Sequence, residues 1–243
     1  LEQLRGRLDE FEGIESTNLP EGINAELRPS QLEGFSVLCH LAKLKLGGIL
    51  ADDMGLGKTL QTLVWLKWLK TSRRKNAKTK PALVVCPASV LPNWRRESER
   101  FTPSMKVLVL ESGQARHNLR KRVPDHDIVV TNYSILRRDL DELAKFAFRA
   151  VVLDEAQFIK NPGAQVTKSV KELKADHKLA LTGTPIENRM LDLWSIVDFV
   201  QPNYLGNQDH FSQVYDLRGA EKDESTARIG RRKLSAKLRP LLL

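Results

Sequence analysis

The most constraining feature of this chain is a glycine-containing turn that follows a short apolar run. Residues 48–51 read Gly-Ile-Leu-Ala, and residues 52–59 continue Asp-Asp-Met-Gly-Leu-Gly-Lys-Thr into a helical pattern over 58–70. A strand that turns directly into a helix gathers outward-pointing backbone N–H groups and the positive end of a helix dipole at one point. Gly55 and Gly57 allow the backbone to approach a ligand closely, because neither has a Cβ atom. The turn is therefore expected to hold a polyphosphate.

Two side chains at the end of this turn suit a nucleotide and its metal ion. Lys58 can reach the outer phosphates, and the Thr59 hydroxyl can ligate Mg²⁺. The general pattern G-x-x-x-x-G-K-[ST] has a glycine where this chain has Asp52, so the match is incomplete. A Gly-Lys-Thr triplet alone also fits an ordinary turn with a helix cap, yet here a strand precedes it and a helix follows. We therefore predict that the ligands are ATP and Mg²⁺.

A second apolar run ends in two adjacent carboxylates. Residues 150–154 read Ala-Val-Val-Leu-Asp, which indicates a buried parallel strand, and Glu155 follows. Neighbouring side chains at a strand end point in different directions. Asp154 is thus expected to face the metal while Glu155 orients and deprotonates an attacking water. The alternative is a solvated strand end or a helix cap. Behind a phosphate-binding turn the pair favours hydrolysis, with Lys58, Asp154 and Glu155 as the catalytic residues.

The charge balance favours a polyanionic partner. Lys and Arg total 39 against 30 Asp and Glu, a formal net charge of +9, although solubility alone also explains such a surplus. No apolar run approaches eighteen residues, so no membrane partner is expected. Cys39 and Cys86 have no C-x-x-C spacing, and we interpret them as small buried hydrophobes in a reducing compartment.

Strand and helix patterns alternate along the chain, which predicts a parallel sheet with helices on both faces. Ligands of such sheets bind beyond the carboxyl ends of the strands. Residues 1–24 are expected to be a flanking segment, 25–206 the nucleotide-binding unit and 207–243 a basic C-terminal segment. The predicted strands are 48–51, 82–86, 106–110, 127–131, 150–154 and 178–182, and the predicted helices are 29–46, 58–70, 89–101, 114–122, 132–146, 163–174 and 190–200.

Further polar residues follow other predicted strands. The Thr182 and Thr184 hydroxyls flank Gly183 and are suited to sensing the γ-phosphate, although an ordinary turn with a helix cap is also sound. The Gln31 amide offers a donor and an acceptor, as the edge of adenine does. The alternative is that Gln31 is an ordinary exposed helix residue. Trp94 is interpreted as a core residue from the apolar pattern around Leu91. Small polar groups that fit nucleic-acid phosphates occur at Pro87, Ala88, Ser89, Thr131, Asn132, Lys160 and Asn161.

The motifs occur in a recognisable order. They are LRPSQLEGF, LADDMGLGKTLQT, VVCPASVLPNWRRE, VVTNY, VVLDEAQFIKN and LTGTPIEN. Together they closely resemble the first RecA-like lobe of superfamily 2 helicase-like ATPases, and among these the Swi/Snf-type DNA translocases. The resemblance covers nearly the whole chain from Leu27 onward. Asp52 in place of glycine is itself typical of that family, while the DEAQ form is a less common variant of DEGH and DEAH.

This resemblance implies a fold and a set of nucleotide contacts. The fold is an α/β, RecA-like P-loop sandwich of three layers, with a mostly parallel central sheet and helices on both faces. Gln31 is implied to contact adenine, Thr59 and Asp154 to bind Mg²⁺, and Glu155 to activate water. The residues implied to hold the nucleotide are Gln31, Asp53, Met54, Gly55, Leu56, Gly57, Lys58 and Thr59.

The resemblance also implies motion along DNA. Thr182 and Thr184 would couple hydrolysis to movement, and the family tracks one strand of duplex DNA without separating the strands. The implied contacts to the DNA backbone are Pro87, Ala88, Ser89, Thr131, Asn132, Lys160 and Asn161. The implied protein partner is an unidentified protein bound to the same DNA.

The family binds ATP between two lobes, and the second lobe supplies an arginine finger. No second Gly-Lys-Thr or second run of strands occurs in the sequence, and the chain begins at Leu1, so we expect it to be part of a longer protein with a second RecA-like lobe. An arginine finger contributes about 10³–10⁵ in rate. The chain alone is therefore expected to bind ATP weakly and to hydrolyse it very slowly.

Two other functions remain open from the sequence. One is a strand-separating DNA or RNA helicase of the same superfamily, and the other is a nucleotide-gated DNA-binding module without meaningful hydrolysis. The compartment depends on the source: cytoplasm and nucleoid in a bacterium, which the DEAQ form favours, or the nucleus in a eukaryote.

Overall fold

The central element of the protein is a six-stranded sheet in which every described strand pair is parallel. The computed structural model describes residues 14–51, 55, 57–72, 79–113, 115–183, 190–215 and 224–243, with residues 224–229 and 231 described by their backbone alone. The strand order is β1-β6-β5-β2-β4-β3. The strands are β1 (Gly48–Ala51), β2 (Ala82–Cys86), β3 (Val107–Leu110), β4 (Ile128–Asn132), β5 (Ala147–Leu153) and β6 (Lys174–Thr182).

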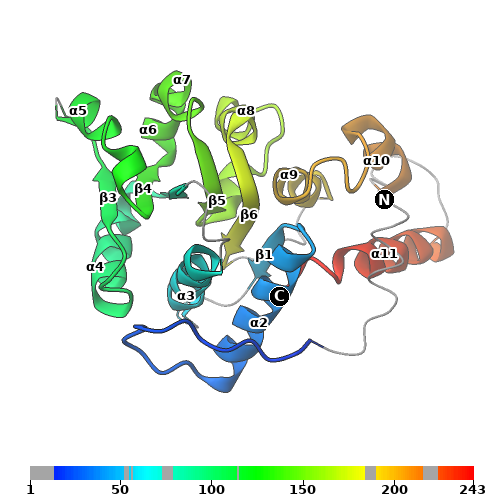
Figure 1. Cartoon of the computed structure of the whole chain (residues 1–243). Helices are drawn as coiled ribbons and strands as arrows, with labels where there is room; N and C mark the ends of the chain where they lie inside the picture. The colour runs from blue at the N-terminus through cyan, green and yellow to red at the C-terminus, as the bar shows by residue number, and fades with distance from the viewer. Residues whose placement is uncertain are drawn as a thin grey trace.

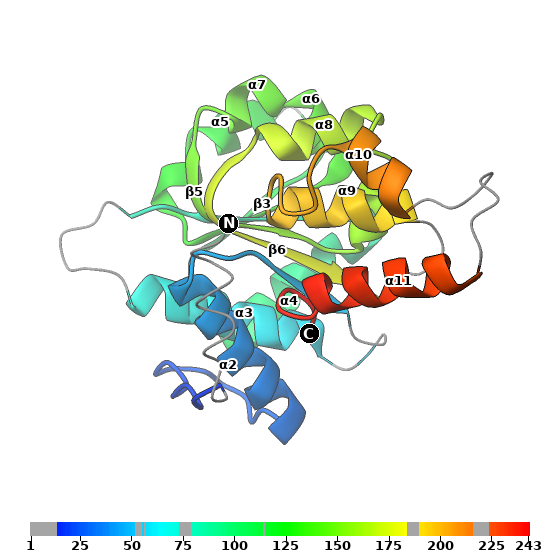
Figure 2. The ribbon, with the colours of Figure 1, turned by 90° about the vertical axis from the view of Figure 1, so that its right-hand side faces the viewer.

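Helices cover both faces of this sheet, which gives three layers (Figures 1 and 2). On one face lie α2 (Pro29–Lys43), α3 (Lys58–Thr71) and α4 (Leu91–Phe101). On the other lie α6 (Tyr133–Arg138), α7 (Leu140–Leu143), α8 (Gln165–Glu172) and α9 (Met190–Val200). The predicted α/β class, with a parallel sheet between helical layers, is confirmed.

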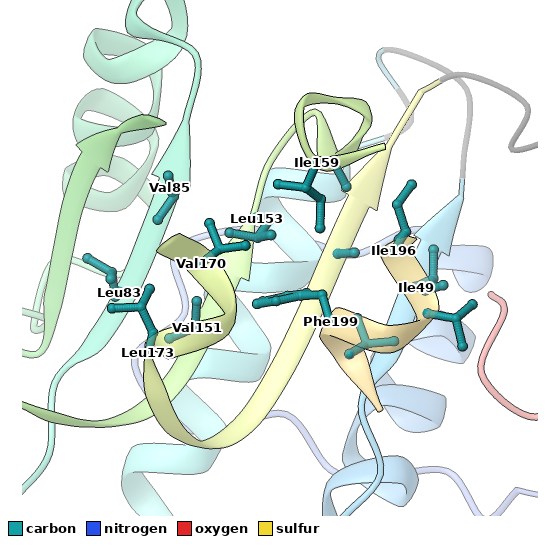
Figure 3. Close-up of a cluster of buried hydrophobic side chains, with 14 of the residues drawn as sticks. Ile49, Leu83, Val85, Val151, Leu153, Ile159, Val170, Leu173, Ile196 and Phe199 are labelled. Atoms are coloured by element: carbon teal, nitrogen blue, oxygen red, sulfur yellow. The ribbon is translucent and has the colours of Figure 1, made fainter. Parts of the chain in front are cut away.

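Side chains alternate between the two faces of the sheet along each strand, and both faces are buried. In β2, Leu83 and Val85 belong to the core beneath α8 and α9, whereas Val84 belongs to the core beneath α2, α3 and α4. Figure 3 shows the first of these cores, where Phe199 of α9 and Val170 of α8 lie over the strands. All of these side chains are fully buried or nearly so. Burial on both faces explains why the strands read as continuous apolar runs rather than alternating ones.

Several predicted boundaries are wrong. The predicted helix over 132–146 is instead α6 and α7, which meet at Asp139, and β5 already begins at Ala147. The predicted helix over 163–174 ends at Glu172, and β6 begins at Lys174 rather than at 178. The first half of β6 is polar and half-exposed, so it lacks the apolar signature of a buried strand.

Two helices in the polar C-terminal region were not predicted. They are α10 (Gln208–Tyr215) and α11 (Glu224–Leu238). Phe211 of α10 is fully buried, and Leu234 and Leu238 of α11 are almost fully buried. So few apolar residues among many polar ones give a weak helical pattern in the sequence. Shorter elements complete the chain: α5 (Arg116–Arg120) and the 3₁₀ turns at Ala88–Val90 (η1), Val123–Asp125 (η2) and Ala156–Ile159 (η3).

The cysteine and membrane expectations are tested within the described residues. Cys39 and Cys86 are fully buried in the core, as predicted, and burial raises the pKa of each thiol to about 12. In the part of the chain that the structure describes, no helix is long and apolar enough to cross a membrane.

The last residues of the chain cover the outer edge of β1. Ile49 N–H donates to the Leu241 carbonyl at 2.7 Å, and Ala51 N–H donates to the Leu243 carbonyl at 2.9 Å. Leu243 N–H returns a bond to the Ile49 carbonyl at 2.9 Å. The unpaired groups of an edge strand are thereby satisfied, and the strand that leads into the glycine turn is held from both sides.

Leu241→Ala is expected to destabilise the fold by about 2–5 kcal/mol, because the Leu241 side chain is fully buried and its loss leaves a cavity. Leu242→Ala is the matched control, since the Leu242 side chain is exposed and the same backbone pairing is retained. Urea unfolding of both variants measures the difference. Equal losses in the two variants would contradict the stabilising role of Leu241 packing at this edge.

Candidate nucleotide-binding site

The carboxyl ends of five neighbouring strands meet at one edge of the sheet. Ala51 at the end of β1 lies opposite Thr182 of β6, and Leu153 of β5 lies between Ala180 of β6 and Val85 of β2. Cys86 at the end of β2 lies opposite Asn132 of β4. The turn after β1 and the carboxylates after β5 are therefore on the same edge, separated by the single strand β6.

The turn after β1 adopts the backbone that only glycine tolerates easily. Gly55 has φ of +87° and Gly57 has φ of +86°. Gly57 is the N-cap of α3 and, as a glycine, has no side chain with which to cap this helix end. The N-terminus of a helix without a side-chain cap is suited to an anion. Lys58 and Thr59 form the first turn of α3, whereas Asp53, Met54 and Leu56 lie outside the described residues.

Gln31 lies against this turn although it is distant in the sequence. A Cβ atom at Gly57 would collide with Gln31 Nε2, so the Gln31 side chain would have to shift to make room for it. Gln31 is buried, and its Oε1 accepts a hydrogen bond from Arg28 N–H at 2.9 Å at the start of α2. The structure thus brings together the residue expected to read adenine and the turn expected to hold the phosphates.

Asp154 is held by donors from three segments. Its Oδ2 accepts from the Trp94 indole N–H at 2.8 Å, and its Oδ1 accepts from Glu155 N–H at 3.0 Å. The Tyr133 hydroxyl donates to the Asp154 carbonyl at 2.7 Å. The interpretation of Trp94 as a core residue is confirmed, because its side chain is 1% exposed, but its bond to Asp154 was not foreseen.

Burial raises the pKa of the Asp154 carboxyl. The Trp94 hydrogen bond lowers the same pKa, the negative charge of Glu155 raises it, and the positive charge of Lys58 lowers it. Lys58, at the start of α3, is thus one of the charges that act on the carboxyl at the end of β5. Burial also raises the pKa of Tyr133, and the charge of Asp154 adds to this effect.

Glu155 is connected to Thr182 through Gln157. Gln157 Nε2 donates to Glu155 Oε2 at 2.8 Å, and the Thr182 hydroxyl donates to Gln157 Oε1 at 3.4 Å. Glu155 itself has φ of +52°, which is a costly conformation for a residue with a side chain. Gln157 was not among the predicted site residues, although the fourth letter of DEAQ was the available signal. Thr184 lies outside the described residues.

The residues expected to touch DNA differ in accessibility. Ala88 and Ser89 of η1 are exposed, Pro87 is half-buried, and Lys160 and Asn161 are exposed. Thr131, in contrast, is fully buried, and its hydroxyl donates to the Leu110 carbonyl at 3.1 Å. Asn132 is 9% exposed, and its side chain accepts from Ile135 N–H at 2.9 Å to cap α6. This geometry favours structural roles for Thr131 and Asn132.

The donor set fits magnesium and a polyphosphate. Asp154 supplies carboxylate oxygens and Thr59 a hydroxyl, which are the hard oxygen ligands that Mg²⁺ prefers. The carboxylate is largely withdrawn from water, and its two described hydrogen-bond donors are both neutral. A cation would offset that desolvation. Among the described residues, none lies within 4 Å of a Cβ atom added at Gly55, so these residues leave room beside the glycine turn.

Comparison with known proteins agrees with this geometry. The family model for the SNF2-related domain matches residues 30–243. The chain belongs to the SNF2-related domain family. A solved structure of the Sulfolobus solfataricus SWI2/SNF2 ATPase core in complex with dsDNA superposes with a TM-score of 0.81 at 39% identity, covering 93% of this chain and 46% of that chain. The resemblance to the Swi/Snf-type ATPases is therefore confirmed.

Curated relatives are much longer than this chain. TATA-binding protein-associated factor mot1 of Schizosaccharomyces pombe is 36% identical over 95% of this chain, which spans 13% of that relative. The putative ATP-dependent helicase/translocase YwqA of Bacillus subtilis is 38% identical over 99% of this chain, which spans 26% of it. The SNF2-related domain thus occurs within larger proteins from a yeast and a bacterium.

Asp154→Asn is expected to stabilise the ligand-free fold at neutral pH. Because burial raises the folded-state pKa of Asp154, the stability gained by binding a proton is present at low pH and is lost as the pH rises through that value. At neutral pH the buried charge therefore costs stability, and the neutral amide removes that cost.

Urea unfolding without nucleotide or Mg²⁺, at pH 7.5 and near pH 4, measures the effect, which should shrink at the lower pH. Asp125→Asn, at an exposed carboxylate in η2, is the control and should change little at either pH. A loss of stability in Asp154→Asn at pH 7.5 would contradict the account.

Proposed function

We propose that this chain is the ATP-binding lobe of a double-stranded-DNA-stimulated ATPase and translocase that remodels protein–DNA complexes without separating the strands. The observation that supports this most is the meeting of two motifs at one sheet edge. The glycine turn before Lys58 and the Asp154–Glu155 pair lie one strand apart, and Lys58 is near enough to lower the pKa of Asp154.

The residues divide the work of phosphoryl transfer to water. Backbone N–H groups at the start of α3 and the Lys58 ammonium hold the phosphates, and Gln31 orients the adenine. Thr59 and Asp154 would hold Mg²⁺, which would neutralise charge at the phosphate oxygens. Glu155 accepts a proton from the attacking water. The Gln157 amide fixes the Glu155 carboxylate and connects it to the Thr182 hydroxyl, which gives hydrolysis a route to β6.

Duplex DNA is proposed to dock on the exposed residues at the same edge. Ala88 and Ser89 offer small side chains at the start of a helical segment, and Lys160 offers a positive charge. The Sulfolobus solfataricus core that superposes on this chain was solved with dsDNA. The net charge of +9 favours a phosphate backbone as partner.

Hydrolysis is proposed to require a second RecA-like lobe of the same protein. This chain covers 46% of the matched ATPase core, and we propose that a second lobe within the remainder of such a core faces the nucleotide. An arginine finger from that half contributes about 10³–10⁵ in rate. The 243 residues alone are therefore proposed to bind ATP weakly and to turn it over very slowly.

The protein displaced from DNA depends on the parent protein. The names of the Schizosaccharomyces pombe and Saccharomyces cerevisiae relatives refer to a TATA-binding protein, whereas the Bacillus subtilis relative is named only as a helicase/translocase. We propose a DNA-bound protein as the substrate. The compartment would be the nucleoid and cytoplasm of a bacterium or the nucleus of a eukaryote.

Glu155→Gln is expected to keep ATP binding and to lower DNA-stimulated turnover of the intact protein by at least a hundredfold, because the amide cannot accept the proton. Lys58→Ala is expected to weaken both binding and turnover. Steady-state hydrolysis with and without duplex DNA, together with binding of a fluorescent ATP analogue, measures the two effects. Undiminished hydrolysis in Glu155→Gln would remove its role as base, and strand displacement by the native protein would favour a helicase instead.

DNA affinity is expected to fall steeply with salt, because each neutralised phosphate releases condensed counterions. Lys160→Ala should reduce the slope of log K against log salt by about one. Lys145→Ala is the control. This exposed lysine pairs with Glu142 on α7 and lies just before the amino end of β5, away from the carboxyl ends of the strands. An affinity for duplex DNA that does not change between low and high salt would argue against contact with the backbone.

A further inference from the structure

Trp94 has an unusual hydrogen-bond partner for a buried tryptophan. Its indole N–H donates to a carboxylate, Asp154 Oδ2, at 2.8 Å. The indoles of Trp65 and Trp194 are also buried, but they donate to main-chain carbonyls, those of Leu38 and Gly206. A backbone carbonyl would satisfy any of these indoles. The choice of Asp154 therefore points to a role for Trp94 beyond packing.

The bond fixes the orientation of the Asp154 carboxylate. Oδ2 is held by Trp94, and Oδ1 is held by Glu155 N–H at 3.0 Å. A carboxylate accepts about four hydrogen bonds or metal contacts in all, so each oxygen keeps a lone pair for other ligands. The plane of the carboxylate, and with it the direction of those lone pairs, depends on where Trp94 lies.

Trp94 is close along the chain to the segment that is proposed to meet DNA. The exposed residues Ala88 and Ser89 belong to η1, and α4 begins at the next residue after η1 ends. Trp94 lies in the first turn of α4 and points to the sheet, while η1 faces solvent. Only one helical turn therefore separates the exposed residues of η1 from the buried indole.

The second strand tip has a matching contact. Tyr133 follows Asn132 at the end of β4, and its hydroxyl donates to the Asp154 carbonyl at 2.7 Å. The Tyr133 ring stacks on the exposed Phe158, with ring centroids 4.7 Å apart. The segments that follow β2 and β4 thus each place one donor on Asp154. Of these two donors, Trp94 is the one that reaches the carboxylate.

We propose that Trp94 is a positioning residue whose indole N–H transmits the placement of the DNA-facing segment 88–94 to the Asp154 carboxylate, and so adjusts the affinity of the nucleotide site for Mg²⁺. This inference rests on the proposed function. It assigns a physical route by which duplex DNA stimulates hydrolysis: binding at η1 moves α4, α4 moves the indole, and the indole reorients the carboxylate.

The test compares Trp94→Phe with Trp194→Phe in the intact protein. Each variant removes one indole donor and keeps an aromatic ring, but Trp194 lies on α9 and bonds to a main-chain carbonyl. Binding of a fluorescent ATP analogue is followed as Mg²⁺ is titrated, with and without duplex DNA. Trp94→Phe should raise the Mg²⁺ concentration for half-saturation by about 10–100-fold, as loss of a group that orients a metal ligand does. It should also abolish the shift that DNA produces in the native protein, whereas Trp194→Phe should change neither.

A second measurement needs no substitution at position 94 and no Mg²⁺. In protein labelled with ¹⁵N-tryptophan, the indole signal that Asp154→Asn displaces identifies Trp94. Addition of duplex DNA without nucleotide or metal should move this signal and leave that of Trp194 in place. This experiment decides the question even if Trp94→Phe does not fold.

The possible failures are distinguishable. If the native protein shows neither Mg²⁺-dependent nucleotide binding nor a response to DNA, the proposed function falls. Suppose that it shows both, yet Trp94→Phe needs the same Mg²⁺ concentration for half-saturation as Trp194→Phe, or the Trp94 indole signal does not move when DNA is added. The proposed function then stands, and the positioning role of Trp94 is overturned.

Discussion

The parallel register of the sheet is the constraint on which the rest of the site depends. Because all the described strands run in one direction, the turn after β1, the carboxylates after β5 and the segment after β2 must emerge at one edge. An antiparallel neighbour would send one of these motifs to the opposite edge. The apolar cores on both faces, visible in Figure 3 for one of them, stabilise this register against slippage.

Within this sheet, Asp154 is a group whose burial in the charged form lowers the stability of the fold. Its carboxylate is largely buried, and its described donors are the neutral indole of Trp94 and a backbone N–H. Burial raises its pKa, so the ligand-free protein bears an unfavourable charge that a bound cation would offset. Glu155 adds backbone strain at the next position. Both features fit a site that reaches its favourable state only when nucleotide and metal are bound.

The sequence predicted the parts of the site that depend on local patterns. The turn after β1, the strand that precedes Asp154 and the alternation of strands and helices were all predicted, because glycine, charge and apolar runs are local signals. The strand order was not predicted, and neither were α10 and α11, where Phe211, Leu234 and Leu238 are too sparse to form a pattern. Thr131 was expected at a DNA surface but is buried, since the depth of a strand end in a sheet is set by its neighbours.

By itself the sequence determined which residues are candidates for phosphate binding and hydrolysis, and its ordered motifs determined the family. Only the tertiary structure decided which of them meet: Gln31 with the Gly57 turn, Gln157 between Glu155 and Thr182, and Trp94 on Asp154. The reason is physical. A side chain's chemistry is fixed by its covalent structure, whereas its partner is fixed by packing between elements that lie far apart in the chain.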